Sequence, residues 1–281
     1  MTAPSTPAAH MRAIAQAADR LNRAVETRTP CAPVRDLIGA TDIDAAYAVQ
    51  ERLTTSRTAA GGVIVGRKIG LTSPAVQHQL GVDRPDFGVL FADMEIADGA
   101  EVSTGQLLQP KVEAEIAFVL AADLADGPLD AAQVRSAVGA AVPALEIVDS
   151  RIAGWDISFA DTVADNASSG LYVLGTATRT LAEFDPVSAE MVMTVDDQPA
   201  SVGNGAACLG DPLEALRWLA VTARDLGQPL RAGQIILSGA LGPMVPVRSG
   251  TVVTAVISGL GSVTARFIPA PAPSSQETSQ S

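Results

Sequence analysis

The sequence predicts an α+β protein in which helices near the N-terminus precede a mixed or antiparallel sheet. Apolar residues recur at helical spacing before Gly61–Gly62, and short apolar runs bounded by Gly and Pro follow that point. Only two further helix signals interrupt these runs, and several runs are neighbours along the chain. Because strands do not alternate strictly with helices, a doubly wound parallel sheet is disfavoured.

Two amphipathic helices are expected in an N-terminal helical region covering residues 1–65. Between residues 10 and 27 an apolar residue recurs every three or four positions, and the members of this stripe are Met11, Ile14, Ala18, Leu21 and Val25. The second helix is expected to begin with Asp42 as its N-cap and to run toward Arg57. Residues 1–9 are rich in Pro, Ser, Thr and Ala, so we expect them to be mobile.

A catalytic mixed-sheet domain is expected over residues 66–268. Its strands are predicted at 63–71, 112–120, 142–148, 171–174, 191–195, 235–238 and 252–258. Helices are predicted at 130–139 and 211–226, the second because Asp211 as N-cap, Pro212 and Glu214 form a helix start signal. Residues 269–281 are rich in Pro, Ser and Gln and are expected to form a disordered tail.

Composition excludes several classes of partner. Hydrophobic types make up 47% of the 281 residues but aromatics only 4%, so the core is expected to consist of many small aliphatic side chains. The net charge of -12 argues against nucleic acid and anionic membrane surfaces, because both require clustered positive charge. No run reaches the roughly 18 apolar residues of a membrane span and no signal-peptide pattern is present, so a cytoplasmic protein is expected.

Carboxylates are paired on one face of the strand predicted at 112–120. Strand alternation places Glu113 and Glu115 on one side, and Val112, Ala114 and Ile116 on the other. Two carboxylates this close repel each other unless a cation or a shared proton lies between them, which a hard divalent metal would explain. The alternative is a solvated strand face.

Glu146 is the single acidic residue in the apolar run at 142–148. A buried carboxylate requires a partner, which is either a metal or a basic group such as Arg151. If Glu146 joins Glu113 and Glu115, the all-oxygen ligand set suits Mg²⁺ or Mn²⁺ better than Zn²⁺. Only two histidines are present, so a histidine-rich metal site cannot form.

Two further groups are candidates for the chemistry. Lys68 shares a strand face with Gly66 and Gly70, which leave room beside the ammonium for a substrate carboxylate or for proton transfer. The alternative for Lys68 is a strand-end lysine whose ammonium reaches water. Asp86 lies in turn-forming sequence, where the alternative role is a turn or helix cap.

Several segments resemble signatures of the 2-keto-4-pentenoate hydratases of the fumarylacetoacetate hydrolase superfamily, and they occur in the right order along the chain. The resemblance covers roughly residues 10–268, and its segments are Gly66–Thr72, Pro85–Gly88, Leu90–Met94, Gln109–Ala117, Pro143–Glu146, Asp161–Ser168 and Gly239–Met244. It implies a mixed β-roll with peripheral and N-terminal helices, assembled into homo-oligomers.

The resemblance also assigns roles to residues. It implies that Glu113, Glu115 and Glu146 bind a divalent metal, Mg²⁺ or Mn²⁺, and that Lys68 and Asp86 are catalytic at the reacting end of the substrate. It further implies substrate contacts from a group that consists of Thr72, Asn166 and Ser168.

The implied activity is that of a lyase acting on a small anionic 2-oxo acid. Water would add to 2-hydroxypenta-2,4-dienoate, the enol of 2-oxopent-4-enoate, or to a close alkyl analogue, giving 4-hydroxy-2-oxopentanoate. This reaction belongs to the meta-cleavage catabolism of aromatic or related ring compounds. A pathway aldolase or decarboxylase is the partner protein that the resemblance suggests.

Three other activities compete with hydration. A 2-oxo-3-hexenedioate decarboxylase would use the same site, although the segments Gln109–Glu113 and Asp161–Ser168 favour the hydratase branch. Acylpyruvate hydrolases carry His two positions before the first metal-binding Glu, and this chain has Lys111 there. A non-catalytic assembly subunit has no physical need for clustered carboxylates, so retention of all three glutamates argues against it.

Overall fold

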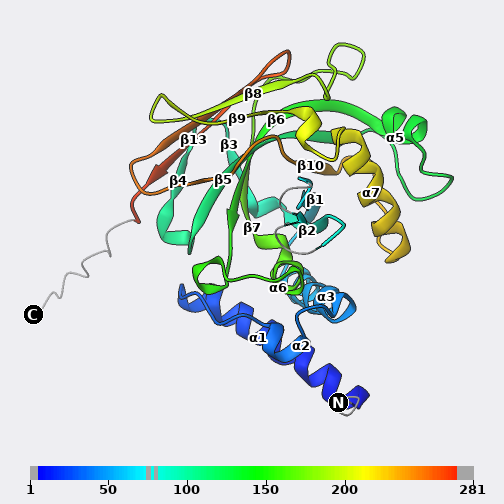
Figure 1. The fold of residues 1–281 in the computed structure, drawn as a ribbon, viewed down its shortest axis with the longest axis vertical. Helices are drawn as coiled ribbons and strands as arrows, with labels where there is room; N and C mark the ends of the chain where they lie inside the picture. Colours follow the sequence, from blue (N-terminus) through cyan, green and yellow to red (C-terminus); the bar gives the residue numbers. More distant parts are fainter. Residues whose placement is uncertain (1–5, 74–76, 79–81, 271–281) are drawn as a thin grey trace, which may run out of the picture.

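The computed structural model describes residues 6–73, 77–78 and 82–270 (Figure 1). The predicted tail therefore lies outside the described residues from position 271 onward, as do residues 1–5 of the segment expected to be mobile. The rest of that segment is helical, contrary to the prediction. Thr6 is the N-cap, with its hydroxyl accepting a hydrogen bond from the Ala9 N–H, and Pro7 suits the first helical position.

Four helices form a small layer of their own. They are α1 (Pro7–Thr27), α2 (Arg35–Ile38), α3 (Ile43–Ala59) and α6 (Phe159–Ala164), and they lie together at the bottom of Figure 1. Asp42 caps α3 as predicted, accepting a hydrogen bond from the Ala45 N–H at 3.0 Å. The α2 and α6 helices are too short to produce a periodic apolar pattern, which is why the sequence did not predict them.

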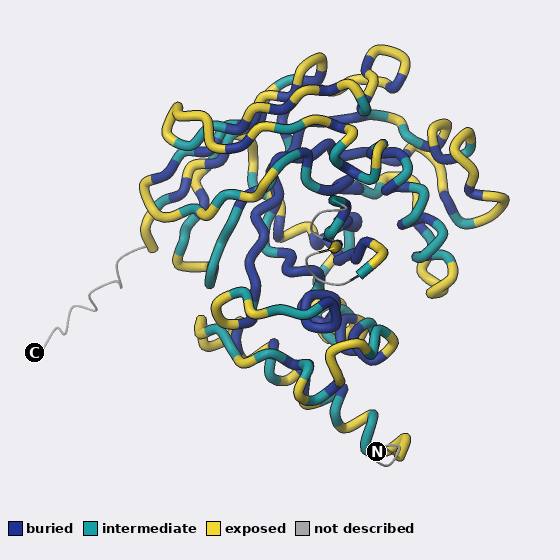
Figure 2. The backbone as a smooth tube through the Cα atoms, in the orientation of Figure 1, coloured by how far each residue is buried: buried dark blue, intermediate teal, exposed yellow. Residues whose placement is uncertain are grey.

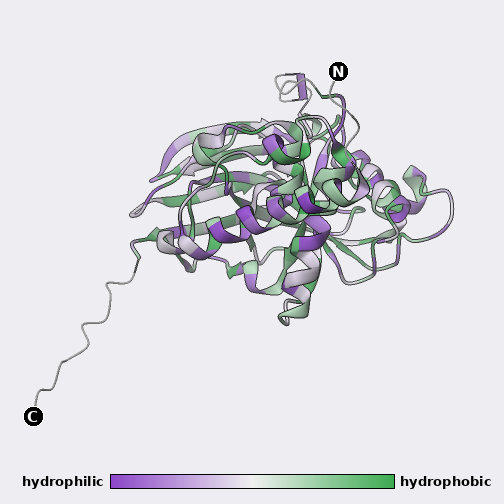
Figure 3. Ribbon diagram, turned by 90° about the horizontal axis from the view of Figure 1, so that it is seen from below, coloured by the Kyte–Doolittle hydropathy of each residue, from purple (hydrophilic) through white to green (hydrophobic). Residues whose placement is uncertain are grey.

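The apolar stripe of α1 is buried only in its middle. Ile14, Ala18 and Leu21 join one apolar cluster with residues of α3 and α6. Met11 and Val25, which share the predicted stripe, remain 62% and 52% exposed because they lie toward the two ends of the helix. Figure 3, seen from the side of α1, shows helical ribbons that carry both hydrophilic and hydrophobic residues.

A mixed eight-stranded sheet forms the centre of the molecule. Its path order is β2-β1-β10-β5-β6-β7-β3, with β11 pairing on β5. The β1/β10 and β3/β7 pairs are parallel and the others are antiparallel, which confirms the predicted mixed sheet. The strands are β1 (Ile64–Gly70), β2 (Asp86–Phe91), β3 (Glu95–Ala97), β5 (Pro110–Leu120), β6 (Val138–Asp149), β7 (Ser169–Leu174), β10 (Ile235–Ala240) and β11 (Val245–Pro246).

A five-stranded sheet, in the order β4-β13-β12-β8-β9, covers one side of this sheet. Its strands are β4 (Glu101–Ser103), β8 (Glu190–Val195), β9 (Gln198–Asn204), β12 (Val252–Ile257) and β13 (Gly261–Ile268). The sequence predicts β8 and β12, but not the three-residue β4, nor β9 and β13. The β9 strand is a mostly exposed edge strand, and β13 alternates small or polar residues with its buried ones.

The two remaining predicted helices are present. The α5 helix spans Ala131–Ala137 with Asp130 as its N-cap, and β6 begins immediately after it at Val138. The α7 helix spans Pro212–Asp225, and the Asp211 side chain accepts a hydrogen bond from the Leu213 N–H at 2.8 Å. Within the described ranges, no helix is long and apolar enough to cross a membrane.

The largest core cluster lies between the two sheets and α7. Alternate residues of β5, among them Val112, Ile116 and Phe118, contribute to it together with Val253 of β12 and Leu216 of α7. Figure 2 shows the central strands as continuous buried backbone. One face of β5 is therefore committed to the core, as the alternation predicted, and the opposite face is free to carry polar groups.

Replacing Phe118 with alanine should destabilise the fold by about 3–5 kcal/mol, because the ring is fully buried and its loss leaves a cavity. Urea denaturation measures this change. Val256→Ala on β12, where the side chain is 51% exposed, is the control and should change stability by less than about 0.5 kcal/mol. If both substitutions changed the free energy of unfolding equally, Phe118 would not be part of the hydrophobic core.

Candidate active site

The pairing of β5 with β6 brings the three glutamates together. In this antiparallel pair Glu113 lies directly opposite Glu146, and Glu115 follows two residues along the same face of β5. One carboxylate oxygen from each residue lies within 4.8 Å of the others. Glu115 and Glu146 are 0% and 1% exposed, while Glu113 is half-buried. The solvated strand face, the alternative for Glu113 and Glu115, is therefore wrong.

Lys68 reaches this cluster from β1. Its Nζ lies 3.1 Å from Glu146 Oε1 and donates a hydrogen bond to the Ala167 carbonyl at 2.8 Å. The residue is 3% exposed, so the alternative of a lysine that reaches water is wrong. Glu146 does not pair with Arg151, which instead binds Asp165 through its guanidinium.

Asp86 is the first residue of β2 and lies opposite Gly70 of β1. Its Oδ2 accepts a hydrogen bond from the Thr162 hydroxyl at 3.1 Å, whereas its buried Oδ1 has no hydrogen-bond partner among the described residues. It therefore caps no turn or helix. A Cβ on Gly70 would lie 2.2 Å from Asp86 Oδ1 and 3.4 Å from Lys68 Nζ, so only glycine leaves space for both groups.

The glycine at position 66 has a different role from the one expected. A Cβ there would lie 1.9 Å from the Ile235 carbonyl oxygen, so Gly66 permits close approach of the β10 backbone. It does not provide room beside the Lys68 ammonium.

Burial and mutual repulsion shift the protonation of the site. Burial, reinforced by the Glu146 carboxylate, raises the pKa of Glu113 to about 7 and raises the pKa of Glu115 well above its usual range. Burial also raises the pKa of Glu146 and Asp86, although Lys68 opposes both shifts. Burial disfavours the Lys68 ammonium, but the surrounding carboxylates outweigh it and raise the pKa of that lysine.

A strained loop holds Lys68 in place. Asn166, Ala167 and Ser168 all have left-handed backbone, with φ values of 53°, 50° and 53°. The Asn166 amide accepts a hydrogen bond from the Val89 N–H at 2.7 Å and donates to the Val89 carbonyl at 3.0 Å. These bonds tie the loop to β2, and the Ala167 carbonyl then meets Lys68. Ser168 is 3% exposed, and no group of the described residues forms a hydrogen bond with its hydroxyl.

Thr72 lies against the backbone that binds Glu115. The Gly239 N–H donates to Glu115 Oε2 at 2.8 Å, and a Cβ on Gly239 would lie 2.4 Å from Thr72 Oγ1. The φ of +109° at Gly239 also disfavours any side chain. Sequence analysis assigned no role to Gly239 or Thr162, although both lie in segments that carry the family resemblance. Their partners are distant in sequence, so only the fold reveals these contacts.

Comparison with known proteins defines the class. A family model described as the C-terminal region of fumarylacetoacetate hydrolase matches residues 65–268. The chain belongs to the fumarylacetoacetate hydrolase family. The fold class predicted from the sequence is confirmed as that of this family.

Individual relatives indicate which branch of the family this chain resembles most strongly. The chain is 56% identical to a TodF product hydratase of Pseudomonas putida, over 91% of this chain and 95% of that protein. It is 53% identical to a 2-keto-4-pentenoate hydratase of Dechloromonas aromatica, over 89% of this chain and 96% of the relative. These similarities confirm the resemblance to the 2-keto-4-pentenoate hydratases.

A solved structure shows the same fold. The 4-oxalocrotonate decarboxylase from Pseudomonas putida, complexed with magnesium and adipate, superposes with a TM-score of 0.88 at 33% sequence identity. The match covers 95% of this chain and all of that one (100%).

Asn166→Ala should lower the free energy of unfolding by about 1–3 kcal/mol, because it leaves the Val89 backbone groups without partners. Chemical denaturation gives this value, and hydrogen exchange at the Val89 amide reports the local loss directly. The control is Asn22→Ala on the exposed side of α1, which should be almost neutral. Unchanged exchange at Val89 in the Asn166 variant would contradict the role given to this side chain.

Proposed function

We propose that this protein is a hydro-lyase that adds water to 2-hydroxypenta-2,4-dienoate, or to a close alkyl analogue, in the catabolism of aromatic compounds. The product would be 4-hydroxy-2-oxopentanoate. The observation that carries the proposal is the convergence of Lys68, Asp86 and three glutamates in a chain more than half identical to named hydratases. Assembly into a homo-oligomer and association with a pathway aldolase or decarboxylase stay predictions from the family resemblance.

The glutamate cluster fits a hard divalent cation. Glu115 Oε1 and Glu146 Oε2 are buried and have no hydrogen-bond partner among the described residues, and a cation between the carboxylates would relieve their mutual repulsion. Carboxylate oxygens suit Mg²⁺ or Mn²⁺, and we propose that Glu113, Glu115 and Glu146 bind one of these ions. When bound, the metal would supply Lewis-acid polarisation of the substrate's 2-oxo group.

The residues of the chain account for charge and proton movement. The net reaction places hydroxyl on C4 and hydrogen on C3 and C5, while the 2-hydroxyl loses its proton to become the carbonyl. Lys68 supplies positive charge close to the anionic substrate and to the oxygen on which charge develops. Asp86 Oδ1 would orient the attacking water and accept its proton.

Burial suits Asp86 to this task. Its raised pKa brings the carboxyl closer to the pH at which it can both accept and release a proton. The Thr162 hydroxyl donates a hydrogen bond to Oδ2 and so fixes the orientation of the carboxylate, which leaves Oδ1 as the oxygen that can bind the water. Thr72 and Ser168 are proposed substrate contacts, because Thr72 lies against Gly239 beside Glu115 and the buried Ser168 hydroxyl has no partner among the described residues. Asn166 would act through the loop that it ties to β2.

The decisive assay follows loss of dienoate absorbance by the purified protein with Mg²⁺ or Mn²⁺, with identification of the product. Conversion to 4-hydroxy-2-oxopentanoate supports the hydratase. A parallel assay with 2-oxo-3-hexenedioate measures release of carbon dioxide. Release of carbon dioxide without hydration of the dienoate would instead assign the decarboxylase reaction, in keeping with the solved relative.

Glu113→Gln should reduce metal-dependent turnover by more than about a hundredfold and weaken metal binding, because a neutral amide replaces an anionic ligand. Turnover assays and calorimetric titration with Mn²⁺ measure the two effects. Glu101→Gln on β4 is the matched control, since that carboxylate is exposed and outside the cluster. Full activity of the Glu113 variant in the presence of a chelator would refute the metal assignment.

Metal affinity should fall as the pH is lowered through about 7. The raised pKa values mean that the metal-free cluster holds protons below this pH, and metal binding must displace them. The expected slope is about tenfold in Kd per pH unit for each proton displaced. Titrations with Mn²⁺ between pH 6 and 8 test this, and an affinity independent of pH would show that the carboxylates are already ionised.

A further inference from the structure

Arg67 is a buried cation that forms no ion pair with any carboxylate in the described part of the chain. It follows Gly66 on β1 and points to the face opposite Lys68, because successive strand residues alternate. Its cross-strand neighbours are Val89 of β2 and Ile236 of β10, both apolar and buried. The residue is 4% exposed.

The Arg67 guanidinium donates two long hydrogen bonds, and both acceptors are uncharged oxygens. One nitrogen donates to the Gly66 carbonyl and another to the Gln228 side-chain oxygen, both at 3.2 Å, and Nε has no partner within the described ranges. Among the described residues, no carboxylate forms an ion pair with Arg67. The buried or part-buried cations Lys68 and Arg151, in contrast, each pair with a carboxylate. Burial lowers the pKa of Arg67 to about 10, and no carboxylate of the described residues pairs with the guanidinium to oppose this shift.

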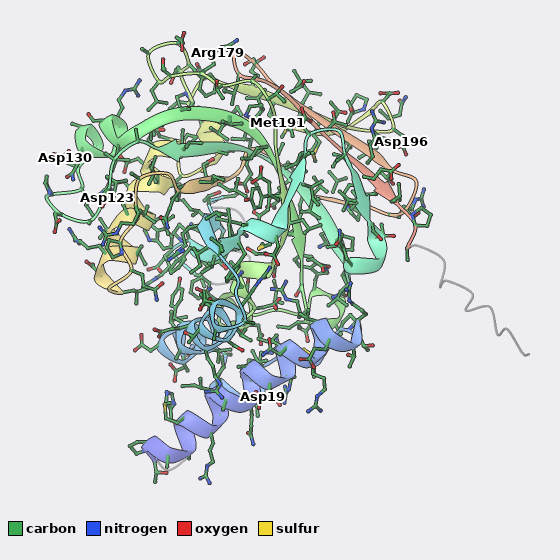
Figure 4. The ribbon with its side chains drawn as sticks, turned by 180° about the vertical axis from the view of Figure 1, so that it is seen from behind. Asp19, Asp123, Asp130, Arg179, Met191 and Asp196 are labelled. Carbon is green, nitrogen blue, oxygen red and sulfur yellow. The ribbon has the colours of Figure 1, made fainter. Side chains whose placement is uncertain are left out.

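A pocket of about 440 Å³ opens beside this group, between α3 and the segment that joins α7 to β10. Thr54, Thr55 and Gln228 line it together with Arg67, which provides neutral hydrogen-bond donors next to the cation. The other arginine of the lining, Arg231, already pairs with Asp123 at 2.8 Å. Asp123 is labelled in Figure 4, on the loop outside the sheet.

We propose that Arg67 and this pocket bind a small oxyanion, a carboxylate or a phosphate, at a second site separate from the glutamate cluster. A guanidinium presents paired N–H donors that match the two oxygens of such a group, and the bound charge would compensate the buried cation. Glu51 also lines the pocket, and its carboxylate repels anions, so an anion with a single charge is expected to bind more tightly than one with two. The site lies on the opposite face of the strand that positions Lys68.

The test is thermal denaturation of the full-length protein titrated with acetate, succinate or inorganic phosphate at constant ionic strength. EDTA is present so that no metal at the glutamate cluster can bind the anion. We expect a saturable rise in Tm of a few degrees relative to NaCl, and the more effective anion identifies the ligand as carboxylate or phosphate. No rise with any of the three anions would overturn the proposal.

Substitutions distinguish anion binding at Arg67 from effects of the anions elsewhere on the protein. Arg67→Met should fold with equal or higher Tm in the absence of anion, because a buried uncompensated charge is removed, and should lose the anion-dependent rise. Arg67→Gln retains a polar side chain and serves if the Met variant does not fold. Arg217→Met, at a partly exposed arginine of α7 that pairs with Glu214, is the control and should retain the rise.

Light scattering on the same proteins tests the competing occupant, an acidic side chain from a second copy of the chain. An unchanged molar mass in Arg67→Met supports the small-anion site. A fall in mass to that of a smaller assembly, or an anion-dependent rise in Tm that persists in this variant, would overturn it.

Discussion

The register between β5 and β6 is the constraint on which the site depends. It sets Glu113 opposite Glu146 and places Glu115 on the same face, so three like charges share a space that excludes most water. Such an arrangement is unfavourable unless positive charge or protons compensate it. Lys68 provides one positive charge, the Gly239 N–H provides a dipole, and the proposed metal would provide the remainder.

The surrounding structure accommodates this cluster by removing side chains and straining backbone. Gly70 leaves the space that Lys68 and Asp86 occupy, and Gly239 allows the chain to pass under Thr72. The left-handed loop at Asn166–Ser168 presents a carbonyl to the Lys68 ammonium. Strained conformations persist only where neighbouring contacts over-determine them, and the two bonds from Asn166 to Val89 have that effect here.

Two adjacent residues of β1 show how strongly the surrounding groups change the pKa of a basic side chain. Lys68 faces carboxylates, and its pKa rises despite burial. Arg67 faces apolar neighbours and neutral acceptors, and its pKa falls. Strand alternation alone separates the two environments, so a single strand carries a catalytic candidate on one face and a proposed anion site on the other.

The amino-acid sequence, through its local patterns, predicts the mixed fold class, the two long N-terminal helices, the central strands and the face of β5 that carries the glutamates. These features follow from local periodicity and capping residues, which act over a few positions. It also singled out Lys68, Glu146 and Asp86 as groups that require an explanation. The prediction that these residues form one site came from the family resemblance, because no local sequence pattern shows which distant strands become neighbours.

The pairing of each charged side chain becomes visible only in the folded chain. Strand register placed Glu113 opposite Glu146, and folding gave Arg151 to Asp165 and left Arg67 without an acid among the described residues. The edge strand β9 and the buried strand β2 were missed because exposure and turn-like residues hide their alternation. Pairing across the chain depends on which strands become neighbours, and that outcome is set by packing of the whole core, which local sequence patterns do not encode.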